Sequence, residues 1–465
     1  MKIYAPVTEA VLDALKTIVG AEYVLTEPEK LEQYQTDEET DPRKFHLPEA
    51  VVLPKDAQEI AAVIKLANIY DVPVTVRSGG TSLAGGAIPV CGGIVLLMER
   101  LNKIIELNAE GMYMEVEAGV RTVDIQKYAN EAGFLYAGDP CSAESCLIGG
   151  NIATNAGGNK AVRYGVTRDQ VYAVEVVTPT GEIVELGARL KKKSTGYCLE
   201  QLIMGSEGTL GIITKATLKL LPLCPYKLDL LAIFTDLDKA VGLVPNLIKA
   251  GLNPTSVEFM DNAFVRSSSD YCELKLPHYE DGFYVIVTVE TFNEDELESK
   301  MEQLDEICSA SGATDVLEAD DRVWKLRRNC LESTRVLSLV STSDDLVVPV
   351  DQIANCIRHL TRVAENYNFK LFTLAHAGDG NLHFQILKGE MSDEQWEDEV
   401  SRFHAEAYPY VYSLGGRLSG EHGIGAKKVE AMEKYTEPVE MKMMKEIKRA
   451  LDPKNILNPG KVFNA

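Results

Sequence analysis

The sequence has no apolar run near the roughly 20 residues needed to cross a bilayer, and no CxxC pair to hold zinc or an iron–sulfur cluster. Basic residues are also scarce, since 47 Lys and Arg stand against 70 Asp and Glu. The formal net charge of -23 would repel nucleic acid and anionic lipid over most of the surface. We therefore expect a soluble protein with no transmembrane segment and no nucleic-acid partner, whose nine scattered cysteines are mostly reduced thiols.

Targeting features are missing from the N-terminus. Residues 1–20 have neither the basic start and apolar core of a secretory signal nor the Arg-rich, acid-poor bias of an organellar presequence. A cytoplasmic location is the simplest expectation.

At 465 residues the chain exceeds the usual size of one domain, so we expect two or more packed units. Between about residues 50 and 220, β-branched runs alternate with Gly-rich turns and one clear helical pattern, which predicts an α/β or α+β unit. That helix should begin at a capping box of Asp56 and Glu59 and end before Pro73. A proline-bearing stretch predicts a boundary near residue 224, and the C-terminus from about 430 is predicted to be helical.

Three glycine-rich segments stand out in the first half. The first, Arg77–Gly86, follows the strand-like run VPVTV and could cradle an anion with backbone N–H groups. It matches neither dinucleotide nor mononucleotide signatures, and alone it is more typical of a plain loop. Two further segments of this kind, Gly138–Gly158 and Gly205–Thr214, favour a ligand-binding role over a plain loop. Three such loops indicate a long ligand lying against backbone.

Histidines cluster in the second half. The chain has seven, and three of them lie in the segments HAGDGNLH (376–383) and GEHG (420–423). Strand-like runs flank Asp379-Gly380, which predicts a hairpin with a two-residue turn that pairs residue 376 with residue 383. His376 and His383 would then leave one face with Cβ atoms about 5 Å apart, close enough to share a metal. The two histidines alone are equally compatible with a structural pair.

Glu421 adds a carboxylate to this set. Two imidazoles and one carboxylate leave coordination positions open, as in catalytic metal sites, and the mixed nitrogen and oxygen ligands suit Zn²⁺, Mn²⁺ or Fe²⁺.

The three loops resemble, in order and spacing, those of the vanillyl-alcohol oxidase or p-cresol methylhydroxylase (PCMH) type of FAD-binding fold. The resemblance implies that the first loop wraps the pyrophosphate, the second lines the ribityl chain and isoalloxazine, and Glu207 with Ile213 lies near the adenosine. Covalent members commonly have a histidine where this chain has Thr81, so non-covalent FAD is expected. The residues implied to bind FAD are Arg77, Ser78, Gly79, Gly80, Thr81, Ser82, Pro140, Gly149, Gly150, Asn151, Thr154, Gly157, Glu207, Ile213 and Asn458.

The histidine segments and the terminal DPKNILNPGK resemble the FAD-linked D-2-hydroxy acid dehydrogenases over nearly the whole chain. That group includes D-lactate dehydrogenase, the glycolate oxidase flavoprotein subunit and D-2-hydroxyglutarate dehydrogenase. The resemblance implies that the metal ligands are His376, His383 and Glu421, with zinc favoured over manganese or iron. It also implies that His422 takes the hydroxyl proton and that Asn381 contacts substrate.

The substrate carboxylate should meet a guanidinium, which offers a planar bidentate fork. The segment Trp324–Arg328 resembles the family's WxLR element, which makes Arg327 the first choice and Arg328 the competitor. Enzymes for 2-hydroxyglutarate carry a lysine for the distal carboxylate two residues before an aspartate, where this chain has Ser343. A monocarboxylate such as D-lactate is therefore favoured.

The expected architecture is α+β: a two-subdomain PCMH-type FAD-binding domain over 1–224, a cap domain with an antiparallel sheet over 225–430, and a helical segment over 431–465 that packs back on the FAD domain. Because the chain has no second redox group, electrons would pass to a separate carrier, an electron-transferring flavoprotein or an iron–sulfur subunit. Glycolate or D-2-hydroxyglutarate oxidation, a flavin-bearing electron-transfer subunit and an oxygen-using oxidase remain alternatives, and a homodimer stays open.

Overall fold

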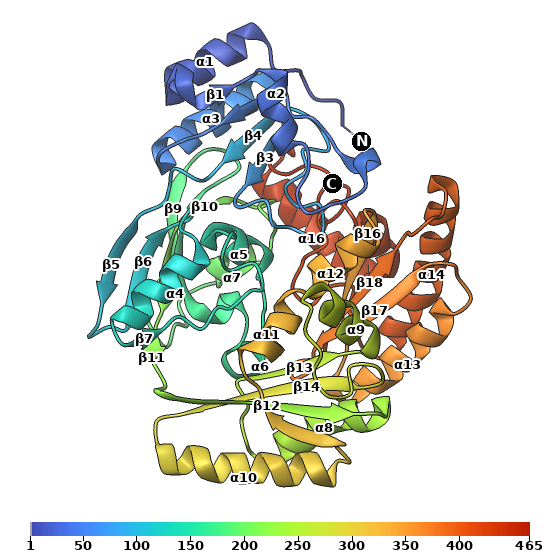
Figure 1. Cartoon of the computed structure of the whole chain (residues 1–465). Helices are drawn as coiled ribbons and strands as arrows, with labels where there is room; N and C mark the ends of the chain where they lie inside the picture. Colours follow the sequence, from blue (N-terminus) through green and yellow to red (C-terminus); the bar gives the residue numbers. More distant parts are fainter. Residues whose placement is uncertain (1) are drawn as a thin grey trace. The chain divides into compact units, whose positions relative to one another are not determined.

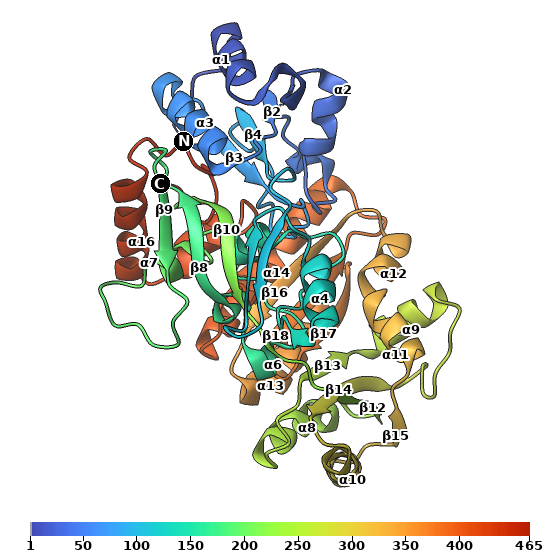
Figure 2. The same cartoon turned by 90° about the vertical axis from the view of Figure 1, so that its left-hand side faces the viewer.

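The computed structural model describes residues 2–465, which form two compact units (Figures 1 and 2). The first unit contains the chain up to Gly157, then residues 166–223 and 421–465. The second contains residues 158–165 and 224–420. The chain thus passes to the second unit at residue 224, where the sequence suggests a boundary, and returns at Glu421, before the segment expected to begin at 431.

A four-stranded sheet lies near the N-terminus of the first unit, in the order β1-β2-β4-β3. Strands β2 and β3 both run parallel to β4. All residues of β2 and β4 are buried, as expected for parallel strands covered on both faces. The strands are β1 (Val24–Leu25), β2 (Ala50–Val52), β3 (Val74–Arg77) and β4 (Ile94–Leu97).

Helix α3 (Ala57–Tyr70) confirms the helix predicted from the capping box. The Asp56 side chain accepts a hydrogen bond from the N–H of Glu59 at 2.9 Å. The apolar residues at helical spacing, Ile60, Val63, Ile64 and Ala67, are all buried. Asp71 ends the helix in a left-handed conformation, two residues before Pro73.

A five-stranded antiparallel sheet forms the rest of the first unit, in the order β5-β6-β10-β8-β9. One apolar core joins the two sheets, since it contains Val52 and Ile94 of the first together with Val116 and Ile212 of the second. The strands are β5 (Ile104–Asn108), β6 (Tyr113–Glu117), β8 (Val171–Val177), β9 (Ile183–Gly187) and β10 (Ile212–Lys219).

The C-terminal segment belongs to this unit and is helical, as predicted. After its helices, Leu457 pairs with Val74 and so adds the end of the chain to the edge of β3. The other helices and strands of the unit are α1 (Glu9–Val19), α2 (Pro28–Leu31), α4 (Thr122–Glu131), β7 (Phe134–Leu135), α5 (Ile148–Thr154), α7 (Leu199–Ile203), β11 (Leu221–Pro222), α15 (Val429–Tyr435) and α16 (Pro438–Leu451).

The second unit is built on a seven-stranded sheet in which every pair of neighbours is antiparallel, which confirms the antiparallel sheet expected there. The order is β15-β12-β14-β13-β17-β18-β16. The strands are β12 (Tyr226–Phe234), β13 (Ser256–Met260), β14 (Phe283–Thr291), β15 (Asp315–Glu318), β16 (Ser341–Val347), β17 (Lys370–His376) and β18 (Asn381–Leu387).

Helices pack along this sheet, with α8 and α10 against β12 and β14, and α9 and α13 against β17. None of the helices formed by residues 2–465 is long and apolar enough to cross a membrane. The helices of this unit are α6 (Ala161–Tyr164), α8 (Leu237–Lys249), α9 (Asn262–Tyr271), α10 (Glu294–Ala310), α11 (Asp321–Arg328), α12 (Cys330–Leu337), α13 (Ile353–Ala364) and α14 (Asp393–Ser413).

Asp261, the residue before α9, predicts a pH dependence of stability. Its carboxylate accepts hydrogen bonds from the N–H groups of Phe264 at 2.8 Å and Thr373 at 2.6 Å, and burial raises its pKa to about 7. Because the folded pKa lies above the unfolded value, its stabilising contribution is complete below about pH 4 and is lost as the pH rises through about 7.

Asp261→Asn keeps an N-cap acceptor but removes this titration. Denaturation by urea should therefore show a smaller loss of unfolding free energy between about pH 4 and 7 in the variant than in the wild type. If the unfolding free energy of both proteins changed equally with pH, the raised pKa of Asp261 would not be the cause.

Candidate functional site

The first glycine-rich loop starts where β3 ends, at Arg77. A Cβ on Gly79 would lie 2.6 Å from the carbonyl oxygen of Ser145, and Gly80 has a left-handed φ of +69° with the Arg77 guanidinium against it. The hydroxyl of Ser82 accepts hydrogen bonds from N–H groups farther along the loop, at 3.2 and 3.0 Å. The glycines are therefore required by close approach, and Ser82 shapes the loop.

The second segment lies against the first. It enters α5, where a Cβ on Gly149 would meet the Cβ of Ala118 at 2.7 Å and one on Gly150 would meet Ser78 at 3.0 Å. Asn151 is buried and donates its amide to the hydroxyl of Thr122 at 3.0 Å. Asn151 therefore anchors the helix.

Other residues of the predicted FAD-binding set are hydrogen bonded within the protein or buried in its interior. The hydroxyl of Thr154 donates to the carbonyl of Gly150 at 3.2 Å, Pro140 is buried, and Ile213 is a buried residue of β10. Thr81 is half-buried in the first loop.

Asn458, from the C-terminal segment, ties the third loop to the first. Its side-chain oxygen accepts from the N–H of Val76 at 2.8 Å, and its amide donates to the carbonyl of Glu207 at 2.7 Å. The N–H of Glu207 in turn donates to Ala153 of the second segment at 2.8 Å. The first unit thus brings together all three loops that the sequence singles out.

The Glu207 carboxylate turns toward the C-terminal segment. It accepts hydrogen bonds from the N–H groups of Ile424 at 2.8 Å and Gly425 at 2.7 Å, and burial raises its pKa. The backbone just beyond the GEHG segment is therefore held by the third loop.

In the second unit, the hairpin of β17 and β18 carries His376 and His383, but its predicted register is wrong. The turn has four residues, 377–380, so His376 pairs with Asn381 and His383 lies opposite Leu374. The turn is wider because the Asp379 carboxylate accepts the N–H of Asn381 at 3.2 Å.

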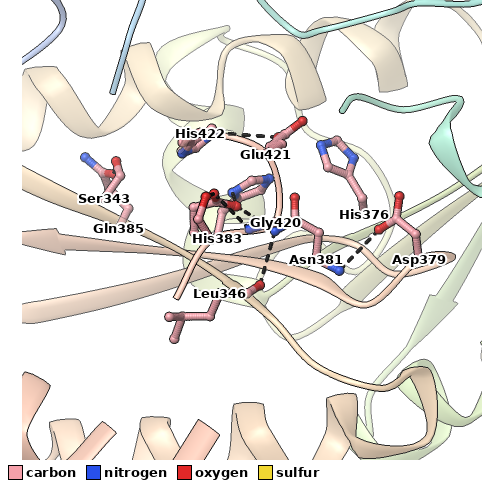
Figure 3. A network of polar contacts seen from close by, with 12 residues as sticks. Ser343, Leu346, His376, Asp379, Asn381, His383, Gln385, Gly420, Glu421 and His422 are labelled. Atoms are coloured by element: carbon pink, nitrogen blue, oxygen red, sulfur yellow. Dashed lines mark hydrogen bonds and ion pairs between the residues drawn. The ribbon is translucent and has the colours of Figure 1, made fainter. Parts of the chain in front are cut away.

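A shift of two residues preserves the face from which each side chain leaves, so the two histidines still lie together. Their ring centroids are 5.1 Å apart, and one ring nitrogen of each lies within 4.8 Å of the other (Figure 3).

Glu258, at the centre of β13, holds His376. It pairs with His376 across the strands, its side chain is fully buried, and its two carboxylate oxygens lie 2.8 and 3.0 Å from Nδ1 of the imidazole. Burial alone would raise the pKa of this carboxyl, but His376 and Arg327 hold it below its usual range.

Arg327 lies on the other side of Glu258, in α11. Its Nε and Nη2 donate to one carboxylate oxygen of Glu258 at 3.0 and 2.6 Å, and the residue is 5% exposed. Arg328, the competing candidate, is exposed. Arg327 thus shares the Glu258 carboxylate with His376.

A second buried carboxylate, Asp345, lies opposite His383 in the register of β16 and β18. One oxygen accepts the amide of Asn381 at 2.6 Å and lies 3.7 Å from Nδ1 of His383. The other accepts the hydroxyl of Ser419 at 2.6 Å and the N–H of Gly420 at 3.1 Å (Figure 3).

The Asn381 amide also donates to Leu346, at 3.1 Å, so its nitrogen is used within the protein. Asp345 therefore orients Asn381 and fixes the backbone that leads into the GEHG segment.

Glu421 and His422 belong to the first unit. Nε2 of His422 lies 3.6 Å from a carboxylate oxygen of Glu421. The other carboxylate oxygen of Glu421 lies 2.8 Å from the place that a Cβ on Gly157 would take, so the Glu421 side chain lies against this glycine. Glu421 thus adjoins the end of the second glycine-rich segment.

Comparison with known proteins matches two family models to this chain. The model described as "FAD linked oxidases, C-terminal domain" covers residues 227–462, and the one described as "FAD binding domain" covers residues 48–187. This chain belongs to the FAD-linked oxidase family. The first unit therefore carries the family's FAD-binding domain.

Relatives of this FAD-linked oxidase include the D-lactate dehydrogenase of Anaerostipes hadrus, which is 36% identical and aligns over 99% of this chain and 98% of the relative. The glycolate oxidase subunit GlcD of Bacillus subtilis is 35% identical, and the alignment covers 91% of this chain and 90% of that protein. The D-2-hydroxyglutarate dehydrogenase of Stutzerimonas stutzeri is 32% identical, and the alignment covers 98% of this chain and 99% of that protein. The chain belongs with this group of oxidoreductases, as the motifs predicted.

Solved structures confirm the fold. The chain is similar to p-cresol methylhydroxylase with a TM-score of 0.83 at 17% identity, covering 99% of this chain and 98% of that one. It is also similar to 4-ethylphenol oxidase from Gulosibacter chungangensis, with a TM-score of 0.78, 18% identity and 99% coverage of both chains. The FAD-linked oxidase therefore has the PCMH-type fold.

Glu258 and Asp345 were not predicted as site residues from the sequence. Both interrupt strand-like stretches with an acid, in TSVEFM and TSDDLV, and a charged residue inside a buried strand is almost always paired. An acid inside a strand-like stretch is thus visible in the sequence, whereas the side chains that pair with it are not.

Gly79→Ala should weaken FAD binding. A Cβ there meets a backbone oxygen rather than a flexible side chain, and overpacking of this kind costs about 1–3 kcal/mol. If that cost falls on the FAD-bound state, FAD affinity drops about 5- to 150-fold. The measurement is a fluorescence titration of the apoprotein with FAD.

Gly242→Ala is the matched control, because nothing lies within 4 Å of a Cβ at that position in α8. Equal FAD affinity in both variants would show that the first loop does not need its close approach.

Proposed function

We propose that this FAD-linked oxidase oxidises a small D-2-hydroxy acid, with D-lactate favoured, to the 2-oxo acid. A divalent metal, with zinc favoured, would be held by His376, His383 and Glu421. His422 would accept the hydroxyl proton, and electrons would leave to a separate carrier protein. The observation that carries this proposal is the pair of imidazoles on one sheet face, a buried one at His376 and a partly buried one at His383, with Glu258 against Nδ1 of His376.

The histidine pair fits a metal chemically. Both carboxylate oxygens of Glu258 lie within hydrogen-bond distance of Nδ1 of His376, so Nε2 would be the nitrogen that coordinates the metal. Ligating histidines in proteins almost always have such a carboxylate or carbonyl partner. The ring nitrogens of His376 and His383, within 4.8 Å of each other, are close enough for one ion. Two imidazoles with one carboxylate form the open ligand set of catalytic rather than structural zinc.

Chain connectivity supports Glu421 as the third ligand. Gly420, held by Asp345 in the second unit, is bonded directly to Glu421, and consecutive Cα atoms lie about 3.8 Å apart. The backbone of Glu421 must therefore start near Asp345, whose partner across the strands is His383. Gly423, with a φ of +82°, then turns the chain sharply after His422.

A bound metal would lower the pKa of the substrate hydroxyl, and bound FAD would serve as the hydride acceptor. The protein's own task is to place groups around the substrate. A neutral imidazole at His422 is suited to accept the hydroxyl proton near pH 7. Arg327 would bind the carboxylate while Glu258 holds one edge of its guanidinium, and Asn381 would contact substrate through its side-chain oxygen.

Neutral side chains beside the histidines favour a monocarboxylate. On the face that carries His383, the next cross-strand pair is Ser343 with Gln385, which are hydrogen bonded to each other. The Gln385 amide also donates to Ser341 at 2.8 Å. A second carboxylate at this place would meet a hydroxyl and an amide instead of a cation, which favours D-lactate over D-2-hydroxyglutarate.

The direct test is anaerobic reduction of the bound flavin, followed by its visible absorbance. Metal-replete protein should be bleached by D-lactate, more slowly by glycolate and D-2-hydroxyglutarate, and not by L-lactate. No bleaching with any D-2-hydroxy acid would reject the proposal. Peroxide formed in air, compared with reduction of an added electron-transferring flavoprotein, then distinguishes an oxidase from a dehydrogenase.

His422→Ala separates catalysis from a structural role of the histidines. General bases contribute about 100- to 10,000-fold, so flavin reduction should slow by at least about 100-fold while FAD content and melting temperature stay unchanged. His46→Ala, at an exposed histidine, is the control and should reduce flavin at the wild-type rate. Lost stability with flavin reduction in proportion to folded protein would instead indicate a structural histidine.

A further inference from the structure

Glu258 is a charged residue in the middle of an apolar strand. Its neighbours Val257 and Phe259 are 1% exposed, and its own exposure is 0%. An ionised carboxylate in such a place is costly unless it is paired and hydrogen bonded. A strand position that needed only to fill the core would favour an apolar side chain, so the acid at 258 points to a further role.

The two partners of Glu258 come from different elements. His376 ends β17, and Arg327 lies in α11, yet both contact the same carboxylate. Arg327 supplies a positive charge that compensates the carboxylate, and His376 donates its Nδ1 hydrogen to Glu258, because an ionised carboxylate can only accept. That hydrogen bond selects one tautomer, in which Nε2 carries the lone pair.

The same contact also orients Arg327. Because Nε and Nη2 both donate to one oxygen of Glu258, the plane of the guanidinium is set and Nη1 is the nitrogen directed away from that oxygen. One buried carboxylate therefore controls the orientation of the imidazole and of the guanidinium together.

We propose that Glu258 is a positioning residue that presents Nε2 of His376 to the metal and Nη1 of Arg327 to the substrate carboxylate. This proposal rests on the proposed function, and it adds a residue that touches neither metal nor substrate. It predicts that metal affinity and the Michaelis constant for D-lactate change together when the Glu258 carboxylate is removed.

Two variants remove the carboxylate by different routes. Glu258→Gln leaves a weaker neutral acceptor for Nδ1, and the double variant Glu258→Met with Arg327→Met removes both buried charges, which limits the risk of misfolding. The readout is Zn²⁺ affinity of the full-length FAD-loaded protein, measured by competition with a chromophoric chelator. Loss of a partner of this kind costs about 10- to 100-fold in metal affinity.

We expect Zn²⁺ affinity to fall about tenfold or more in Glu258→Gln and further in the double variant, with FAD content unchanged. Arg327→Met alone should raise the Michaelis constant and leave Zn²⁺ affinity within a few-fold of wild type, because Glu258 still holds His376.

Asp344→Asn is the matched control on the opposite face of the same sheet. Asp344 is 1% exposed and, like Glu258, pairs with an imidazole, that of His404 at 2.7 Å, and with the hydroxyl of Tyr408 at 2.9 Å. Cutting this pair should lower stability without changing Zn²⁺ affinity.

Wild-type Zn²⁺ affinity in both Glu258 variants, or a loss equal to that in Asp344→Asn, would overturn the proposal. If the wild-type protein itself binds no Zn²⁺ and its flavin is not reduced by D-lactate, the proposed function fails instead.

Discussion

A carboxylate buried inside a β-sheet has to be compensated, and this requirement organises the histidine face of the second unit. Glu258 meets it with one guanidinium and one imidazole, and these are the groups that the proposed chemistry uses. Without Arg327 the charge of Glu258 would be unbalanced in the core, and without Glu258 the contact that selects the tautomer of His376 would be lost. The same contacts thus compensate the charge of Glu258 and orient the imidazole and the guanidinium.

Asp345, which pairs with His383 across the strands, is a second buried carboxylate that holds several groups in place. It combines a side-chain partner, Asn381, with the backbone of Gly420, so it links the sheet to the segment that carries Glu421 and His422. In the first unit, Asn458 has an equivalent place between Val76 and Glu207. In each case a single polar side chain joins segments distant in sequence, because hydrogen bonds tolerate less displacement than apolar packing.

The fold class and the loops could be predicted because they rest on local signals. The Asp56 N-cap, the glycine-rich segments and the strand-like runs each report on a few neighbouring residues, and the helix, loops and strands that they predict were found in the structure, although Glu59 accepts the N–H of Lys55 and not that of Asp56. The hairpin shows the limit of such reasoning. Its turn is wider than predicted, with the Asp379 carboxylate accepting the N–H of Asn381. The histidines stay on one face because the shift is an even number of residues.

Non-local features escaped prediction for a physical reason. The pairing of Glu258 with His376 depends on which strands are neighbours, and β13 and β17 are separated by more than 100 residues of sequence. The placement of residues 158–165 in the second unit likewise follows from packing that no local pattern reports. Acids inside strand-like runs nevertheless mark where such partners should be sought.

The central claim is that His376 and His383 bind a metal in the working enzyme. X-ray absorption spectroscopy of active, FAD-loaded protein at the edge of the metal it contains tests this most directly. The account predicts one ion per chain with two imidazole nitrogens at about 2.0–2.1 Å and further oxygen ligands. Fully active protein without stoichiometric metal, or a metal with no imidazole in its first shell, would contradict it.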